Sequence, residues 1–431
     1  MKRLIFLFSI LCVSAYPFTH TSHPAGAYTL SCALDDENNR LYLSGTSMKN
    51  IVIYNLDEDG LPVGQFISCE IPTNCISLAL FSNKLYIGNS QDGYLYIYQL
   101  GKDGLLTGTP TLAAIATEGQ GAYSLAIDPG KRKLYVGNMA GANNICVYSL
   151  DSSGLPTGAP SFFTTSGYTT SLALNPIQGK LYIGSYSGDN PFVCWLAADG
   201  SLTGRGWKYN SGNLTYSMAL DIEKRRLYLA NNNASDNLSV VKLDEEGLPS
   251  TYTTYSDGGA SISLALNKRS RKLYVGKNYA GSNLYVYDLD HKGDLQGKPT
   301  ILSLGGPTFS LAIGKRLYLA NYQSDNNLWT LEIPDARPQV LAPATTTTQK
   351  VTLRVSSANP HWIKIQGDIS QPLGWKASDG GAMEIPVYLT KGEGDKKIDL
   401  LFLESAGFGN YSAVLRKESV SINLQKDGTK K

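Results

Sequence analysis

The sequence predicts an all-β protein: a seven-bladed β-propeller of four-stranded blades followed by a small C-terminal β-sandwich domain. Two observations carry this prediction. One unit recurs seven times along the chain, and each copy contains four strand-length apolar runs separated by turn residues. Gly (43) and Tyr (27) are frequent, whereas only 17% of the 431 residues are charged, which is typical of β-structure with many tight turns.

The first fifteen residues have the layout of a secretory signal peptide. Lys2 and Arg3 supply the positive start, residues 4–13 are apolar, and small residues precede a cleavage site after Ala15. The apolar stretch is shorter than the ~20 residues that cross a bilayer, and we expect no membrane span elsewhere. A buried first strand is the alternative interpretation. The signal predicts a mature protein that is secreted, periplasmic or at the cell surface.

The charge balance excludes one class of partner. The formal net charge is +2, and removal of Lys2 and Arg3 with the signal leaves a formally neutral protein. A protein that binds nucleic acid by neutralising phosphates needs a clear basic excess. We therefore expect no nucleic-acid partner, and we expect a monomer.

The mature chain has five cysteines, an odd number for an oxidising compartment. Cys69 and Cys75 are close enough in sequence to bridge a loop between strands. Cys32 stands where the other repeats carry Leu or Met, so we interpret it as a small core residue. There is no Cys-x-x-Cys pair, Cys/His cluster or complete calcium loop, so we expect no metal and no cofactor.

Each repeat has a fixed internal order. Its most regular segment reads Leu-Tyr-apolar-small and is preceded by a strand such as residues 76–80. A third strand follows, such as residues 284–289, and then a Leu-Asp-x-x-Gly turn and a variable fourth strand. This succession is the layout of a propeller blade. The seven copies of the segment begin at Leu41, Leu85, Leu134, Leu181, Leu227, Leu273 and Leu317.

Ser occupies one inner-strand position in all seven copies, from Ser31 to Ser310, and Ala follows two residues later. The period of two puts both on one face of the strand. Inner strands crowd near the propeller axis, so we interpret these small side chains as packing residues rather than as a ring of catalytic serines.

The ring of blades has to be closed by an outer strand in the last blade. Two segments compete for that place, residues 16–22 before the first blade and residues 337–341 after the last. We favour the N-terminal segment because it would join the two ends of the ring.

Residues 85–89, 134–138, 227–231 and 317–321, with the Asn-x-x-Val-Tyr-x-Leu-Asp-x-x-Gly pattern of residues 283–293, carry a family resemblance. The unit resembles the YVTN-type and lactonase-like seven-bladed propellers over roughly residues 16–341. The resemblance implies the propeller fold. It also implies either a lactone hydrolase, with His, Arg and Glu around the channel, or a protein without a known reaction.

One face of the propeller is predicted to carry the loops between second and third strands, which are rich in Asn, Ser, Gly and Tyr. Loops that enter the inner strands add further aromatic residues. Turn formation explains most of the Asn. The functional interpretation is a neutral mouth for a polar ligand, either a glycan or a surface protein, bound by Tyr stacking and amide hydrogen bonds. The candidate ligand-binding residues are Asn138, Tyr186, Asn231, Tyr279, Tyr322 and Asp325.

The opposite face is predicted to carry basic turns, such as residues 131–133 and 224–226, beside acidic turns, such as residues 57–59 and 244–246. Mixed signs of this kind indicate a solvated, salt-bridged surface.

A lactonase needs a group that polarises the carbonyl and a base that activates water. The four histidines, His20, His23, His291 and His361, all lie outside the predicted channel loops. The sequence therefore favours a binding or scaffold protein, and a lactonase-like hydrolase is the alternative. Its candidate catalytic residues are Asp189, Arg205, Asp236 and Glu118.

The repeat stops near residue 341, and the Thr-rich residues 342–348 are predicted to form a linker. Residues 349–431 alternate apolar and polar side chains, which indicates a β-sandwich of six or seven strands. Trp362 and Trp375 are the only tryptophans of this domain and could serve its core or form a ligand platform. We expect an accessory domain that docks the propeller onto a partner, anchors it or acts as a spacer.

Overall fold

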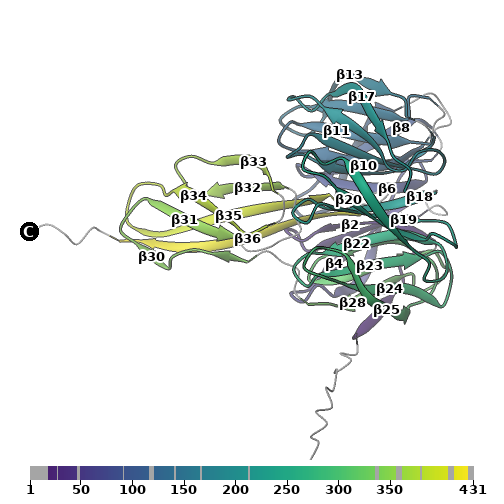
Figure 1. Cartoon of the computed structure of the whole chain (residues 1–431). Coiled ribbons are helices and arrows are strands. Elements are labelled where there is room, and N and C mark those ends of the chain that lie inside the picture. The colour runs from purple at the N-terminus through teal and green to yellow at the C-terminus, as the bar shows by residue number, and fades with distance from the viewer. Residues whose placement is uncertain are drawn as a thin grey trace, which may run out of the picture.

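The structure is a computed structural model of the whole chain. It describes residues 18–26, 28–45, 49–90, 92–115, 121–139, 142–165, 167–211, 214–334, 339–355, 362–378, 381–405 and 412–425. The predicted signal peptide, residues 1–15, lies outside them. The described residues form β-strands and turns without a helix, so the predicted all-β class is confirmed (Figure 1).

Six sheets have four strands each, and a seventh four-stranded set, β2–β5, belongs to a larger nine-stranded sheet. We number these sets as blades 1 to 7. Blades 1 to 3 contain β2 (Thr29–Asp35), β3 (Arg40–Gly45), β4 (Asn50–Leu56) and β5 (Pro62–Glu70); β6 (Cys75–Phe81), β7 (Lys84–Asn89), β8 (Tyr94–Leu100) and β9 (Leu106–Ala114); and β10 (Ala122–Asp128), β11 (Lys133–Asn138), β12 (Ile145–Leu150) and β13 (Pro156–Phe163).

Blades 4 to 7 follow the same antiparallel order. They contain β14 (Thr169–Asn175), β15 (Lys180–Ser185), β16 (Phe192–Leu196) and β17 (Leu202–Lys208); β18 (Thr215–Asp221), β19 (Arg226–Asn231), β20 (Leu238–Leu243) and β21 (Pro249–Tyr255); β22 (Ser261–Asn267), β23 (Lys272–Lys277), β24 (Ser282–Leu289) and β25 (Leu295–Ser303); and β26 (Thr308–Ile313), β27 (Arg316–Asn321), β28 (Leu328–Glu332) and β1 (His20–His23).

The N-terminal strand closes the ring. β1 pairs antiparallel with β28, with His20 opposite Leu331 and His23 opposite Leu328. β1 is therefore the outer strand of blade 7, as the sequence predicted. The competing segment contributes Val340–Leu341 as β29, which pairs instead with β31 of the C-terminal domain.

The repeated Tyr and the repeated Leu-Asp-x-x-Gly turn are two halves of one contact. The buried Tyr of each second strand donates its hydroxyl proton to the turn Gly carbonyl of the next blade, as from Tyr135 to Gly200 at 2.7 Å. Six of the seven tyrosines make this bond. Tyr274 is the exception, because blade 7 takes its outer strand from the N-terminus and has no such turn. Neighbouring blades are thus joined at the same point around the ring.

The seven inner-strand serines are buried, as a packing role requires. Ser77 donates to the Ala122 carbonyl at 2.8 Å, and Ser263 donates to the Thr308 carbonyl at 2.7 Å. In both cases the acceptor belongs to the inner strand of the next blade. A small hydroxyl here lets the two sheets approach and satisfies a buried carbonyl.

The C-terminal domain has two sheets around one apolar core. One sheet continues from blade 1 in the order β33-β32-β35-β36, with β30 also paired to β36, and the other has the order β29-β31-β34. Thr345 and Thr346, within the predicted linker, are the two residues of β30. The strands are β29 (Val340–Leu341), β30 (Thr345–Thr346), β31 (Lys350–Val355), β32 (Trp362–Gly367), β33 (Leu373–Ala377), β34 (Met383–Tyr388), β35 (Gly394–Ser405) and β36 (Ser412–Leu424).

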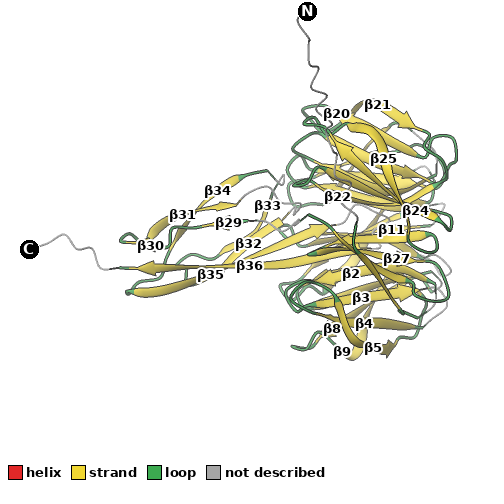
Figure 2. Ribbon diagram, turned by 90° about the horizontal axis from the view of Figure 1, so that it is seen from below, coloured by secondary structure: helices red, strands yellow, loops and turns green. Residues whose placement is uncertain are grey.

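The two domains are joined by the long β35–β36 pair, which runs from the sandwich into the propeller (Figures 1 and 2). The start of β36 pairs parallel with β2, the inner strand of blade 1, from Cys32 opposite Ser412 to Asp35 opposite Leu415. β36 also lies against the inner strands β6 and β26. The hairpin strand therefore occupies the central channel, and it leaves at the face where β2 turns into β3. We call this face the docking face and the opposite one the loop face.

Two tryptophans complete the joint at the docking face. Trp362 is 3% exposed and shares a core cluster with propeller residues. Trp375 lies 6.3 Å from the ring of Phe81, and Lys417 forms an ion pair with Glu37 at 3.7 Å. The sequence predicted a solvated, salt-bridged surface on this face. Exposed ion pairs such as Arg225–Glu245 at 3.7 Å agree with this prediction in blade 5. In blades 1 to 3 the prediction is incomplete, because the second domain covers part of the turns.

The five cysteines of the described part are unpaired, so Cys69 and Cys75 form no bridge in this structure. Among the described residues there is no helix long and apolar enough to cross a membrane. A search of the same residues finds no group of three or more His, Cys, Asp or Glu side chains that could hold a metal ion.

Candidate functional site

A bulge recurs in all seven inner strands, just before the repeated Ser. A β-bulge re-aims the side chain of the extra residue. The residues at this position are Leu30, Ile76, Tyr123, Thr170, Tyr216, Ile262 and Phe309. Five of them, from blades 1, 2, 3, 5 and 7, form one apolar cluster. Residues from so many blades meet only at the axis, so this cluster is an apolar collar in the channel near the loop face.

Exposed tyrosines extend from the collar to the surface. Tyr322 lies with its ring centroid 5.4 Å from Phe309 and 4.8 Å from Tyr28. Tyr186 contacts Tyr216 edge to face at 5.8 Å. Tyr28, Tyr186 and Tyr322 are each 38–39% exposed. We call these three residues, with the collar beneath them, the aromatic mouth.

Burial raises the pKa of the collar hydroxyls of Tyr123 and Tyr216. Both hydroxyls are therefore neutral at physiological pH and can donate hydrogen bonds. The mouth combines exposed aromatic faces with neutral donors. This combination suits a ligand with apolar faces and polar edges.

Two predicted ligand-binding residues belong to the scaffold instead. Asn138 and Asn231 are fully buried. The Asn138 amide donates to the Ile115 carbonyl at 2.9 Å, and Asn231 accepts from Thr215 at 2.8 Å. Their amides are used to hold the loops between second and third strands, so direct ligand contact is corrected to a structural role.

Tyr279 and Asp325 are not members of the collar cluster. The Tyr279 hydroxyl contacts the Tyr285 hydroxyl at 3.0 Å, and Asp325 is exposed in the loop before β28. The structure therefore ties Tyr186 and Tyr322 to one collar and leaves the other four predicted residues outside it. Tyr28 was missed, although it stands three residues before the repeated Ser31, as Tyr168 does before Ser171.

A buried lysine marks blade 6. Lys277 stands where four other blades carry Asn, and its side chain is fully buried. Its ammonium donates to Asp257 at 2.8 Å and to Ser261 at 3.0 Å, and it lies 4.4 Å from the centre of the Tyr285 ring. Burial lowers the pKa of Lys277, and the Asp257 carboxylate opposes this effect. One Asp257 oxygen accepts from Lys277, whereas its other oxygen is buried without a hydrogen-bond partner among the described residues. The pair ties Lys277 to the loop that enters β22.

The described candidate catalytic residues each have a different partner or place. Asp189 forms an ion pair with Lys208 at 3.4 Å. Arg205 lies on the outer strand β17 and stacks over Trp195 at 5.7 Å, so its predicted place at the channel is wrong. Asp236 is exposed in its loop, and its carbonyl accepts from Asn231. Glu118 lies outside the described residues.

The buried carboxyls near the axis serve turns. Asp128 accepts a hydrogen bond from the Lys131 amide at 2.8 Å, and Asn175 and Asn267 do the same in their blades. Burial raises the pKa of Asp35 and of Asp128. These groups lie at the docking face, away from the aromatic mouth. Among the described residues, no acid–base pair is therefore found in the mouth.

Comparisons with known proteins support the fold. No family model matches the chain, and no curated protein matches it. A chain from the crystal structure of the mitotic checkpoint complex matches with a TM-score of 0.56 and 14% identity, over 78% of this chain and 100% of that one.

Two further solved structures are similar. Kuenenia stuttgartiensis hydrazine synthase has a TM-score of 0.55 and 13% identity, covering 73% of this chain and 98% of that one. A Bacteroides uniformis protein described as a candidate 6-phosphogluconolactonase has a TM-score of 0.53 and 14% identity, covering 64% and 85%. At these identities the likeness shows the propeller fold alone.

Proposed function

We propose that the chain is a secreted or cell-surface binding propeller of the YVTN type, and that its aromatic mouth binds a neutral polar ligand, a glycan. One observation carries the proposal: Tyr28, Tyr186 and Tyr322 expose their rings on a collar of packed side chains. Rigid aromatic rings provide contact area at little cost in conformational entropy. Sugar rings present the apolar faces and hydroxyl edges that such a surface recognises.

The charges near the loops agree with a neutral ligand. Lys277 is paired with Asp257 and buried, and Asp189 is paired with Lys208. Affinity would come from stacking and from neutral hydrogen bonds rather than from ion pairs. The protein is proposed to act as a monomer, without a nucleic-acid partner.

A glycan array probed with the full chain tests the proposal, followed by titration calorimetry on the glycans retained. Tyr322→Ala is expected to weaken binding about tenfold or more, because it removes the ring that contacts both Tyr28 and Phe309. Tyr252→Ala is the matched control, since Tyr252 is 47% exposed on the outer strand β21. Equal losses in both variants, or retention of no glycan, would overturn the proposal. Capture of a surface protein that depends on Tyr322 would replace the glycan with a protein ligand.

A lactonase-like hydrolase is the second candidate, supported by the sequence resemblance and by the fold likeness to the Bacteroides uniformis protein. The ion pair of Asp189 with Lys208 and the place of Arg205 on the outer strand β17 argue against it. We expect no turnover of sugar lactones by the full chain. Turnover that is abolished by Asp189→Ala would overturn a binding-only function.

A further inference from the structure

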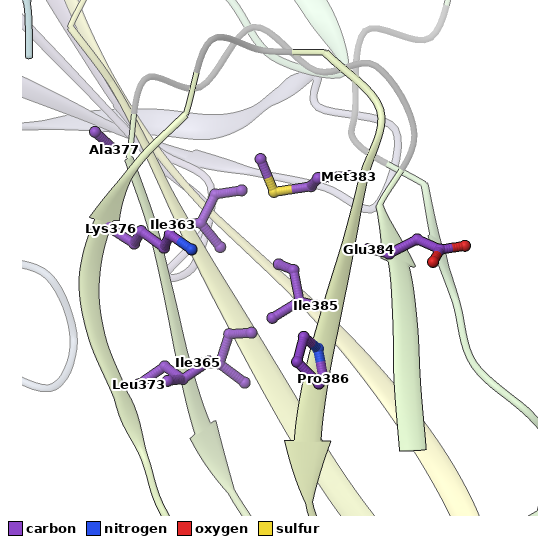
Figure 3. Close-up of a pocket in the computed structure, with 9 residues that line it drawn as sticks. All are labelled: Ile363, Ile365, Leu373, Lys376, Ala377, Met383, Glu384, Ile385 and Pro386. Atoms are coloured by element: carbon purple, nitrogen blue, oxygen red, sulfur yellow. The ribbon is translucent and has the colours of Figure 1, made fainter. Parts of the chain in front are cut away.

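A cavity lies between the two sheets of the C-terminal domain, far from the aromatic mouth (Figure 3). It opens on the side where β33 and β34, the edge strands of the two sheets, face each other. Each of these strands is paired on one side only, by β32 and by β31. The volume of the cavity is about 230 Å³. Its walls are formed by Ile363, Ile365, Leu373, Lys376, Ala377, Met383, Glu384, Ile385 and Pro386.

The cavity is continuous with the apolar core. Ile363 and Ile365 are 4% and 1% exposed and belong to the core cluster, against which Met383 and Ile385 pack. Aliphatic cavities accept apolar guests, and an enclosed one of ~150 Å³ binds benzene. Met383 is a flexible, polarizable side chain that adjusts to an occupant. The space therefore suits an aliphatic chain.

A peptide strand is a poor occupant. β34 contains Pro386, which lies opposite Thr352 of β31. A proline in a sheet is found where its missing N–H faces the free edge, because a paired position needs the donor. The edge of β34 thus lacks a donor beside the cavity, and such an edge is a weak template for an added strand.

The rim of the cavity carries two charged side chains, and only the positive one is directed toward the cavity. Figure 3 shows the Lys376 ammonium directed across the opening toward Ile363, whereas the Glu384 carboxylate points away from the cavity. Lys376 is exposed, so its ammonium can move to meet a ligand. An ammonium at the end of an apolar cavity complements a chain that ends in a carboxylate.

We propose that this cavity is a binding site for a free fatty acid. The aliphatic chain lies between Ile363, Ile365 and Ile385, and the carboxylate pairs with Lys376. The site belongs to the sandwich and is independent of the ligand of the propeller.

The test is a titration of the full chain, labelled with methyl-¹³C methionine, with decanoate and with decanol. The chemical shift of the Met383 methyl group is expected to change with ligand concentration until it saturates. The chemical shift of Met218, which is fully buried in the propeller, is expected to remain unchanged. Lys376→Met should weaken decanoate binding about tenfold and change decanol binding less than about twofold. Glu384→Gln, on the same rim, is the matched control and should change neither.

A second variant examines the cavity itself. Ile385→Trp fills it and should abolish the Met383 shift with both ligands, provided that calorimetry shows an unchanged melting temperature of the propeller. If that variant does not fold, the proposal is tested by the ligand affinities of Lys376→Met and Glu384→Gln alone. The proposal is overturned by a missing Met383 shift, by a shift of Met218 that follows it, or by equal effects of the two rim variants. Binding of the chain to phosphatidylcholine vesicles without free-ligand binding would also overturn it.

Discussion

The two ends of the central channel differ in what fills them. At the docking face the channel contains β36, and Trp362 is buried against the turns of blade 3. At the loop face it ends in the collar, above which three tyrosines are about 38% exposed. Large apolar side chains are present at both ends. At one end they are covered by the same chain, and at the other they are left to solvent.

With the proposed function, this difference separates stability from ligand binding. Substitutions at the docking face should change the free energy of unfolding and leave ligand affinity unchanged. Substitutions in the aromatic mouth should do the reverse. Four predictions test this separation, in order of decreasing effect.

Trp362→Ala is expected to have the largest effect. Removal of a buried aromatic side chain leaves a cavity and costs about 3–5 kcal/mol in the free energy of unfolding. Scanning calorimetry of the full chain measures it. Trp207→Ala is the control, since Trp207 is 47% exposed on β17, and it should cost less than ~0.5 kcal/mol. A smaller effect of Trp362→Ala than of the control would mean that the domains are not held at this face.

Asp128→Asn is expected to stabilise the protein by about 1 kcal/mol near neutral pH. Burial raises the pKa of Asp128, so the folded carboxyl binds a proton at a pH where the unfolded one has released it. Its contribution to stability is therefore greatest in acid and falls as the pH rises through the interval between the two pKa values. An amide keeps the turn hydrogen bond, as Asn175 does.

The gain from Asp128→Asn should consequently disappear below that interval. Denaturant unfolding of both proteins across the acid range measures the difference. A gain that is constant with pH, or a loss at neutral pH, would show that the charged carboxylate is not penalised by burial.

Tyr135→Phe and Tyr274→Phe form a matched pair. Tyr135 donates to the Gly200 carbonyl, whereas Tyr274 has no such acceptor among the described residues. The first substitution should cost about 1 kcal/mol and the second close to nothing. Chemical denaturation provides the comparison, and equal costs would mean that the Tyr–Gly bond does not join the blades.

The smallest expected effect concerns the loop face. The proposed glycan ligand is neutral, so its affinity for the aromatic mouth should change less than about twofold between low and high salt. Calorimetric titrations at both salt concentrations measure this. A steep fall in affinity with salt would show that the ligand is charged.

The fold could be predicted from the sequence because its signals are local and repeated. The Leu-Tyr-apolar-small segment, the inner-strand Ser and the Leu-Asp-x-x-Gly turn recur at regular spacing, and each recurrence strengthens the others. The N-terminal closing strand was predictable for a different reason, since an unfilled outer strand in blade 7 leaves few candidates.

The joint and most of the site could not be predicted. Residues 411–424 alternate apolar and polar side chains as a strand should. This alternation does not indicate which strand they pair with, and β36 pairs with β2, near the other end of the chain. Buried Asn138 and half-buried Asn232 look alike in sequence, because a turn favours Asn in either case. Arg205 was misplaced because the outer strands are the least regular part of the repeat. Tyr186 and Tyr322 were found because a Tyr in a turn has no local structural explanation.

The position of β1 and of β36 has a consequence for the order of events during synthesis. β1, the first of the described strands, belongs to the last blade, and the channel beside β2 receives β36, the last of the described strands. A growing chain therefore exposes two strand edges, of β1 and β2, that have no partner until β28 and β36 have been made. Such unpaired edges are where β-proteins associate wrongly. Maturation of this protein should thus depend on whatever keeps these edges apart until β28 and β36 have been made.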